Sequence, residues 1–309
     1  MKVFLGIDTS CYTTSAALAD EDKNIVCNLK IPLEVAQGKK GLQQSQAVFL
    51  HIRNLRTMFE RNILASYGDI AAVCVSAAPR PQEGSYMPVF TVSAMAGALA
   101  SSVTGAGLFY ATHQHGHIAA ALIGNRKPEQ FLAVHVSGGT TEILKVAAQK
   151  TGFDIEVAGA TKDIAAGQVI DRLGQMLAMP FPAGRYVEEC AQGSTGELGF
   201  KVSTNGTEMN FSGVEAQMGR ALKTHSAETV CASVLTAVAK TLERSVKEAV
   251  KQSGLCDVLF FGGVMSNRKI RAYLAERIPE AQFAKIEYSA DNAAGLAVLA
   301  SDFERGSEV

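Results

Sequence analysis

One local pattern occurs twice in this chain: an apolar strand, a turn of small residues, and a hairpin with a polar tip. The first copy predicts strands at 3–8, 14–18 and 25–31, and the second predicts strands at 132–136, 141–146 and 153–157. The turn after the first strand is expected at Thr9 and Ser10 in one copy and at residues 137–140 in the other. Because a chain that repeats such a unit can build two related lobes, this pattern constrains the fold strongly.

The segments between and after the two copies alternate strands with helices. Helical periodicity occurs at 42–62, 89–103, 163–177, 227–252 and 266–276, with further helices opening near His113 and Asp291. Single strands are predicted at 71–75, 107–110 and 257–261. This alternation predicts an α/β fold of two lobes that face a cleft. We expect residues 1–112 and the last helix, 290–309, in one lobe and residues 113–289 in the other.

Length and charge restrict the class of protein. A chain of 309 residues suits two domains of ordinary size. Its 29 basic and 30 acidic residues give a net charge of −1, so an RNA partner would need a local basic patch or a helper subunit. The candidates for such a patch are Arg53, Arg56, Arg61, Arg80 and Lys162. Scattered cysteines, no apolar run near the roughly 20 residues of a membrane span, and no signal peptide predict a cytoplasmic protein without membrane contact.

A group of histidines gives the sharpest chemical signal. His113 and His117 are four residues apart and would share one face of a helix, as a two-histidine metal site requires, whereas His115 would point elsewhere. Asp291, which opens the last helix, is the candidate third ligand. Two imidazoles and one carboxylate would suit Fe, Zn or Mn, with water or phosphate oxygens completing the shell. The alternative is an ordinary polar helix start at a lobe boundary.

Two glycine turns at strand ends are candidate phosphate sites. Residues 135–141 follow a buried strand, and Gly138 and Gly139 would allow backbone N–H groups to approach a phosphate. Residues 260–264 form the second turn, and the helix that follows it would aim its N-terminus at an anion. The alternative for each turn is an ordinary tight connection.

The segment 163–171 predicts a ligand-facing helix. Asp163, Gly167 and Asp171 are spaced by four residues and would share one helix face. A glycine inside a helix costs about 1 kcal/mol, so Gly167 predicts that another segment packs closely against that face. Asp163 is equally well explained as a helix N-cap, whereas Asp171 lies too deep to cap and would accept hydrogen bonds from ribose hydroxyls.

These segments together resemble a known family. In their order and spacing they are similar to the tRNA threonylcarbamoyladenosine transferase family, also known as the glycoprotease or O-sialoglycoprotein endopeptidase family. The segments that carry the resemblance are 6–11, His51, 113–117, 136–141, 163–171, 181–184, 210–213, 262–268 and 291–292.

The resemblance implies a fold, a reaction and partners. It implies the duplicated two-lobed fold of the actin, hexokinase and Hsp70 superfamily, with one divalent metal on His113, His117 and Asp291. The implied ligand is ATP or an acyl-adenylate, with Mg as an alternative metal that accompanies a nucleotide. The implied reaction moves a threonylcarbamoyl group from its AMP ester to the adenosine beside the tRNA anticodon, with a related two-lobed subunit and a small ATPase as partners. The implied nucleotide contacts are His135, Val136, Ser137, Gly138, Gly139, Asp171, Gly184 and Asn267.

Several positions depart from the family pattern. Tyr12 and Thr13 replace an Asp-Glu pair, His115 replaces an acidic residue, and Thr140 replaces a histidine. The loss of a carboxylate that acts as a base or positions a substrate commonly costs orders of magnitude in rate. The pattern therefore predicts a divergent member of the family, with Asp8 and His115 as candidate catalytic residues.

Three functions from different classes remain open at this point. The first is a transferase that modifies tRNA, and the second is a catalytically weak paralogue that binds nucleotide and metal as a scaffold subunit. The third is a metallopeptidase, which is disfavoured because the sequence has no H-E-x-x-H motif and places no glutamate base beside the histidines.

Overall fold

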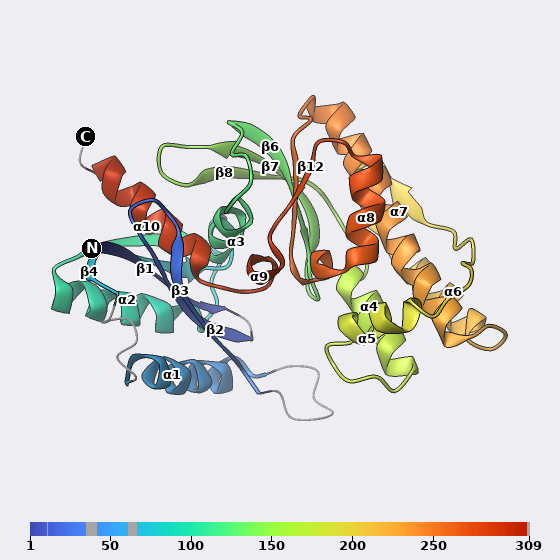
Figure 1. The fold of residues 1–309 in the computed structure, drawn as a ribbon, viewed down its shortest axis with the longest axis horizontal. Helices are drawn as coiled ribbons and strands as arrows, with labels where there is room; N and C mark the ends of the chain where they lie inside the picture. Colours follow the sequence, from blue (N-terminus) through green and yellow to red (C-terminus); the bar gives the residue numbers. More distant parts are fainter. Residues whose placement is uncertain (11, 35–41, 61–66, 308–309) are drawn as a thin grey trace. The chain divides into compact units, whose positions relative to one another are not determined.

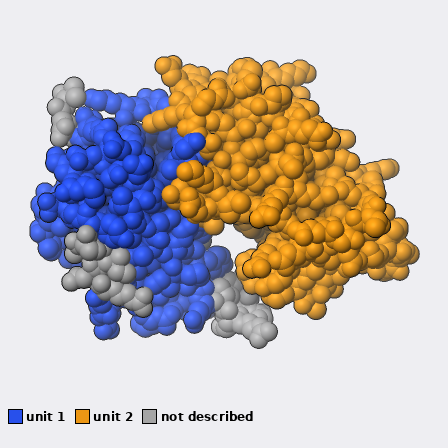
Figure 2. Space-filling model, viewed as in Figure 1, with its two compact units in different colours: residues 1–124, 148–154, 291–309 blue, residues 125–147, 155–290 orange. Residues whose placement is uncertain are grey.

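The computed structural model describes residues 1–10, 12–34, 42–60 and 67–307. The chain forms two compact units (Figure 2). The first unit contains residues 1–124, 148–154 and 291–309, and the second contains residues 125–147 and 155–290. The first unit extends past the boundary expected at residue 113, because the helix that begins there packs against the last helix of the chain.

The first unit contains a mixed sheet of five strands in the order β3-β2-β1-β4-β5 (Figure 1). Strand β2 is antiparallel to both β1 and β3, whereas β4 lies parallel to both β1 and β5. The bounds are β1 Lys2–Ser10, β2 Thr13–Ala19, β3 Ile25–Pro32, β4 Asp69–Ala78 and β5 Gly107–Thr112.

The turn expected at Thr9 and Ser10 is wrong, because both residues belong to β1. They continue the antiparallel ladder, where Thr9 pairs with Thr14 and Ser10 pairs with Thr13. Both side chains are buried, and their hydroxyl groups are satisfied inside the protein: Thr9 donates to the carbonyl of Val89, and Ser10 donates to Asp8. Small polar residues thus indicated a turn where they in fact lie in a buried strand.

In the first unit, the last helix, α10, packs closely against helix α3 and strand β1. Helix α2 packs on β4 and β1, whereas α10 packs on α3, β1, β2 and β4. A side chain at Gly295 would collide with the backbone of Gly116 and Ala120, and one at Gly6 would lie about 2.5 Å from the backbone nitrogen of Ala297. These glycines let α10 approach both α3 and β1 closely. The bounds are α1 Gln44–Glu60, α2 Phe90–Thr104, α3 His113–Ala121 and α10 Ala294–Ser307.

Helix α1 is anchored by a buried polar contact. The ring of His51 lies 2.9 Å from the hydroxyl of Thr14, and the amide of Asn54 donates to the same hydroxyl. The predicted end of this helix at residue 62 lies outside the described residues.

The second unit repeats the strand arrangement of the first. Its sheet has the order β12-β11-β6-β7-β8, with β6 and β7 antiparallel and with β11 parallel to both β6 and β12. Strands β6, β7 and β8 therefore correspond to β1, β2 and β3, and β11 and β12 correspond to β4 and β5. The predicted duplication and the α/β fold class are confirmed. The bounds are β6 Gln130–Val136, β7 Thr141–Ala148, β8 Phe153–Ala160, β11 Val258–Phe261 and β12 Ala281–Phe283.

The helices of the second unit surround a large apolar core. The long helix α7 supplies many of its buried side chains, and it packs against α5 and α8. Sequence periodicity located α4, α7 and α8, but it missed α5, α6, α9, β12 and the small β9–β10 hairpin. The bounds are α4 Ala166–Met176, α5 Gly184–Ala191, β9 Ser203–Asn205, β10 Glu208–Asn210, α6 Ser212–Ala221, α7 Ala227–Ser253, η2 Gly263–Ser266, α8 Arg268–Arg277 and α9 Ile286–Ser289.

The helix predicted from Asp163 begins only at Ala166, so Asp163 does not share a helix face with Asp171. Its carboxylate instead accepts hydrogen bonds from the backbone N–H groups of Phe211 and Ser212, at the start of α6. These bonds and that of Ile164 hold the pKa of Asp163 below its usual value, although burial acts in the opposite direction. Asp163 therefore connects the segment before α4 to the start of α6.

Among the described helices, none has the length and apolar character to cross a membrane.

Candidate functional site

Helix α3 displays two histidines on one face at its first turn. Thr112 caps the helix, and its side-chain oxygen accepts a hydrogen bond from the backbone N–H of His115. This cap fixes where the helix begins, so His113 and His117 are separated by about one helical turn. The centroids of their rings lie 4.3 Å apart.

Asp291 completes a group of three potential metal ligands in the first unit. Its Oδ1 atom lies 3.3 Å from Nε2 of His117 and 3.7 Å from Nε2 of His113. One ligand atom of each of the three residues lies within 4.8 Å of the other two, and no other group of this kind occurs among the described residues. Two imidazole nitrogens and a carboxylate oxygen are a donor set that binds Fe, Zn or Mn, so the residues present fit a divalent ion.

Asp8, near the end of β1, contacts the ring of His113 at Nδ1. Its Oδ1 atom accepts a hydrogen bond of 3.2 Å from Nδ1 of His113, and its Oδ2 atom accepts one of 2.5 Å from the hydroxyl of Ser10. Burial disfavours the charged form of both titratable groups, but their mutual attraction outweighs it. The pKa of Asp8 is therefore lowered, and the pKa of His113 is raised to about 9.

His115 faces away from this group, as its position on the helix predicted. One ring nitrogen lies 2.6 Å from the hydroxyl of Thr112, and the other donates to the carbonyl of Phe153 at 2.9 Å. Burial lowers the pKa of His115, although the bond to Phe153 opposes this shift. Both nitrogens of His115 therefore serve the fold, and these contacts give no support to its candidacy as a catalytic residue.

The second unit contains a cavity of about 710 Å³. Four of the residues predicted to contact a nucleotide line it, namely Gly138, Asp171, Gly184 and Asn267. The other four predicted contacts, His135, Val136, Ser137 and Gly139, are not among the lining residues.

Helix α4 reaches the glycine turn because Gly167 has no side chain. The N–H of Gly167 donates to the carbonyl of Ser137, and a Cβ atom there would lie 2.5 Å from that carbonyl oxygen and 2.7 Å from Cα of Gly138. This contact is the close packing that a glycine inside the helix predicted. One turn later, Asp171 accepts a hydrogen bond from the N–H of Ala183. Burial raises the pKa of Asp171, and this hydrogen bond only partly opposes the shift.

Asn267 links the second glycine turn to helix α8. Its Oδ1 atom caps the helix by accepting from the N–H of Ile270 at 3.0 Å. Its Nδ2 atom is buried and has no hydrogen-bond partner among the described residues, although the residue lines the cavity. An unsatisfied buried donor costs about 1–3 kcal/mol, so this amide is well placed to donate to a bound ligand.

Three of the predicted nucleotide contacts that do not line the cavity, His135, Val136 and Ser137, make contacts within the protein. The ring of His135 stacks on Phe261 at 4.8 Å, in register with the β6–β11 pairing. Val136 is fully buried, and the carbonyl of Ser137 accepts from Gly167. These contacts connect the glycine turn after β6 to β11 and α4.

Sequence reasoning missed the contribution of helix α5. Arg185, Glu188, Glu189 and Gln192 all line the cavity, and Glu188 accepts a hydrogen bond from the N–H of Arg268 at the start of α8. Their spacing of three, four and seven residues is that of one helix face and was the available signal. The eight-residue length of α5 made this signal weak.

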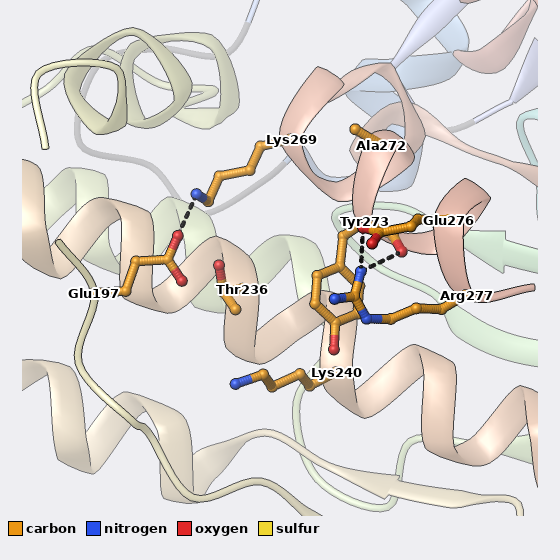
Figure 3. Close-up of a pocket in the computed structure, with 8 residues that line it drawn as sticks. All are labelled: Glu197, Thr236, Lys240, Lys269, Ala272, Tyr273, Glu276 and Arg277. Atoms are coloured by element: carbon orange, nitrogen blue, oxygen red, sulfur yellow. Dashed lines mark hydrogen bonds and ion pairs between the residues drawn. The ribbon is translucent and has the colours of Figure 1, made fainter. Parts of the chain in front are cut away.

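A smaller cavity of about 460 Å³ lies between α7 and α8 (Figure 3). Two of its cations are paired with acids, Lys269 with Glu197 and Arg277 with Glu276. The guanidinium of Arg277 also lies 3.9 Å from the ring centroid of Tyr273. This cavity contains none of the predicted site residues.

Two of the cations predicted to form a basic patch have acidic partners, and the patch itself stays a prediction. Arg56 pairs with Glu60, and Lys162, which belongs to the second unit, pairs with Glu208. Arg61 lies outside the described residues. These pairings reduce the charge that the predicted residues would offer to RNA.

The strand order shared by the two sheets defines an α/β fold of the actin and hexokinase type. A component of the (R)-2-hydroxyglutaryl-CoA dehydratase of Acidaminococcus fermentans superposes with a TM-score of 0.60 at 17% identity, covering 99% of this chain and 100% of that one. A ROK family glucokinase from Streptomyces griseus, solved with glucose and AMPPNP, superposes with a TM-score of 0.54 at 11% identity, covering 96% and 99%. At such identities the similarity establishes the fold alone.

Sequence comparison specifies the family. The family model of tRNA N6-adenosine threonylcarbamoyltransferase matches residues 35–298. Proteins of that name from Neisseria gonorrhoeae and Riemerella anatipestifer are 30% and 29% identical to this chain, covering 86% and 99% of it and 79% and 94% of their own lengths. The chain therefore belongs to the tRNA N6-adenosine threonylcarbamoyltransferase family, and the predicted resemblance is confirmed.

Proposed function

We propose that this chain holds one divalent metal ion on His113, His117 and Asp291, binds an adenylate donor in the larger cavity of its second unit, and transfers a threonylcarbamoyl group to an adenosine of tRNA. The observation that carries the proposal is the convergence of these three ligands in a chain that matches the family over residues 35–298. When bound, the metal would supply Lewis-acid chemistry, which stabilises negative charge on an oxygen that binds it.

The larger cavity supports the nucleotide half of the proposal. Gly138 and Gly263 of the two glycine turns line it, as does Arg268 at the N-terminus of α8, and glycine turns and helix N-termini both favour phosphate. Asp171 offers an acceptor for ribose hydroxyls, and the amide of Asn267 offers an unpaired donor. The cavity volume of about 710 Å³ falls in the range of 300–1,000 Å³ that is typical of small-molecule sites.

The long helix α7 supports tRNA as the acceptor. Lys240, Arg244, Lys247 and Lys251 recur at intervals of four, three and four residues, so they share one face of the helix. Lys240 also lines the smaller cavity with Lys269 and Arg277 of α8 (Figure 3). Lys247, Lys269 and Arg277 are each paired with a glutamate, so Lys240, Arg244 and Lys251 would contribute most to neutralising RNA phosphates, without recognising sequence.

Helix α2 supports a protein partner. It contains no charged residue, and Met95, Leu99 and Val103 form an exposed apolar stripe at intervals of four residues. A face of this kind fits the apolar helix of a related two-lobed subunit. The contribution of a small ATPase stays a prediction.

A second candidate function is that of a binding subunit with little turnover. It is favoured by Tyr12 and Thr13, which stand where the family has acidic residues, while Asp8 on the adjoining strand is already bonded to His113 and Ser10. No feature of the described structure favours a metallopeptidase, since no glutamate joins the three ligands.

One experiment tests the transferase proposal against this second candidate. The chain is incubated with threonine, bicarbonate, ATP, a carbamoyl-adenylate synthase and unmodified tRNA, and the modified nucleoside is measured by mass spectrometry. We expect product with the wild-type chain and none with a His113→Ala, His117→Ala variant. Adenylate binding without any product from the wild-type chain would contradict transfer and favour the binding subunit.

A further inference from the structure

We propose that Asp8 is a positioning residue that orients His113 as a metal ligand. This inference rests on the metal site of the proposed function and adds a residue that does not itself bind the ion. It is carried by the hydrogen bond of 3.2 Å between Nδ1 of His113 and Oδ1 of Asp8.

The fold places Asp8 where only a partnered carboxylate is tolerated. The residue is fully buried, near the end of the central strand β1. An isolated buried charge is costly unless hydrogen bonds and an opposite charge compensate it. Asp8 has both, because Ser10 donates to Oδ2 and His113 donates to Oδ1. The carboxylate is thus held from two sides, which limits its rotation.

A carboxylate so held determines which nitrogen of His113 faces the ion. It accepts a hydrogen bond from the N–H at Nδ1, so Nε2 carries the lone pair that can bind the ion. Nε2 is also the atom of His113 that points toward Asp291, at 3.7 Å. Carboxylate partners of this kind fix the tautomer and ring orientation of a ligating histidine and increase its basicity. The hydrogen bond between Asp8 and His113 therefore assigns this role to Asp8.

Asp8 does not fit the role of a ligand. It is absent from the group of residues whose ligand atoms converge, and its two oxygens are already engaged. The competing explanation is a purely structural ion pair between β1 and α3. That explanation predicts that removing the charge of Asp8 affects stability and leaves metal affinity unchanged.

The test measures metal affinity at fixed pH in the full chain, by chelator competition with Zn²⁺ and by the visible absorption spectrum of bound Co²⁺. Asp8→Asn keeps the shape and an acceptor but removes the charge, and we expect about 10- to 100-fold weaker binding with an altered Co²⁺ spectrum. The matched control is Asp302→Asn, which removes a carboxylate paired with Lys23 in the same unit. The control should leave affinity and spectrum unchanged.

A Kd for Asp8→Asn within twofold of wild type, or an unchanged Co²⁺ spectrum, would overturn the positioning role while leaving the metal site intact. A wild-type chain that binds neither ion would overturn the metal site and this inference with it. If Asp8→Asn fails to fold, Ser10→Ala provides the test, because it frees one oxygen of Asp8 and leaves the bond to His113. We expect several-fold weaker binding for Ser10→Ala, and unchanged affinity would count against the proposal.

Discussion

The candidate site of the first unit consists of four converging side chains, whereas that of the second unit is a cavity lined by both glycine turns and polar side chains. In the first, two imidazoles and two carboxylates from α3, β1 and the segment before α10 meet beside the sheet. In the second, Gly138 and Gly263 of the turns after β6 and β11 line a cavity together with polar side chains of α4, α5 and the start of α8. Because both sheets have the same strand order, the difference comes from the loops and helix starts. On our proposal, the duplicated scaffold provides one site for a cation and another for an anion.

Removing the two histidines should separate the two units most strongly. The double variant His113→Ala, His117→Ala should lose stoichiometric metal, because only Asp291 would remain of the three ligands. The cavity of the second unit should bind an adenylate as before. Elemental analysis and calorimetry measure the two properties, and unchanged metal content would contradict the ligand assignment.

The reverse separation is expected from Gly167→Val. Its side chain would collide with Ser137 and Gly138, so the turn must shift, at a cost of about 1–3 kcal/mol in stability and with at least a tenfold loss of adenylate affinity. Metal content should persist. Gly219→Ala is the matched control, because that helical position has open space and alanine is favoured there by up to about 1 kcal/mol. Normal adenylate binding by Gly167→Val would break the account of the turn.

Two substitutions at Asn267 separate its roles as helix cap and ligand donor. Asn267→Asp keeps the acceptor that caps α8 but loses the free amide donor, so adenylate affinity should fall about tenfold with little change in stability. Asn267→Ala loses both and should also lower the free energy of unfolding by about 0.5–2 kcal/mol. Denaturant unfolding and calorimetry together measure these effects. Equal adenylate affinity for Asn267→Asp and wild type would exclude the donor role.

The smallest effect concerns the cations of α7. Replacing Lys240, Arg244 and Lys251 with glutamine should weaken tRNA binding. The slope of log Kd against the logarithm of the salt concentration should fall by about one for each cation removed. Lys145 and Lys162, which pair with Glu156 and Glu208 elsewhere in the second unit, provide the control variants. A salt dependence that changes equally in both sets would show that α7 is not the RNA surface.

Much of the fold followed from the sequence because its signals were periodic or repeated. The doubled strand–turn–hairpin unit predicted the shared sheet order, and long apolar patterns located α2, α4 and α7. Shorter elements such as α5 were missed, since eight residues give few turns of periodicity. Thr9 and Ser10 misled because small polar residues lie in turns more often than in buried strands.

The site was predictable where spacing along one element decided it. His113 and His117 share a face because they are four apart on one helix, and Gly167 indicated close packing for a similar local reason. Two features depend instead on contacts between distant segments. Asp163 bonds to residues near 211, and Asp8 bonds to His113 across 105 positions, so neither role was visible in the local pattern.

We propose that two side chains of α3 and one from the segment before α10 hold a metal ion. The most direct test of this proposal is a crystal structure of the metal-loaded chain with an anomalous difference map at the metal edge. We predict a single peak, about 2.0–2.2 Å from Nε2 of His113, Nε2 of His117 and an oxygen of Asp291. A peak at other residues, or none in a chain shown to contain metal, would contradict the account.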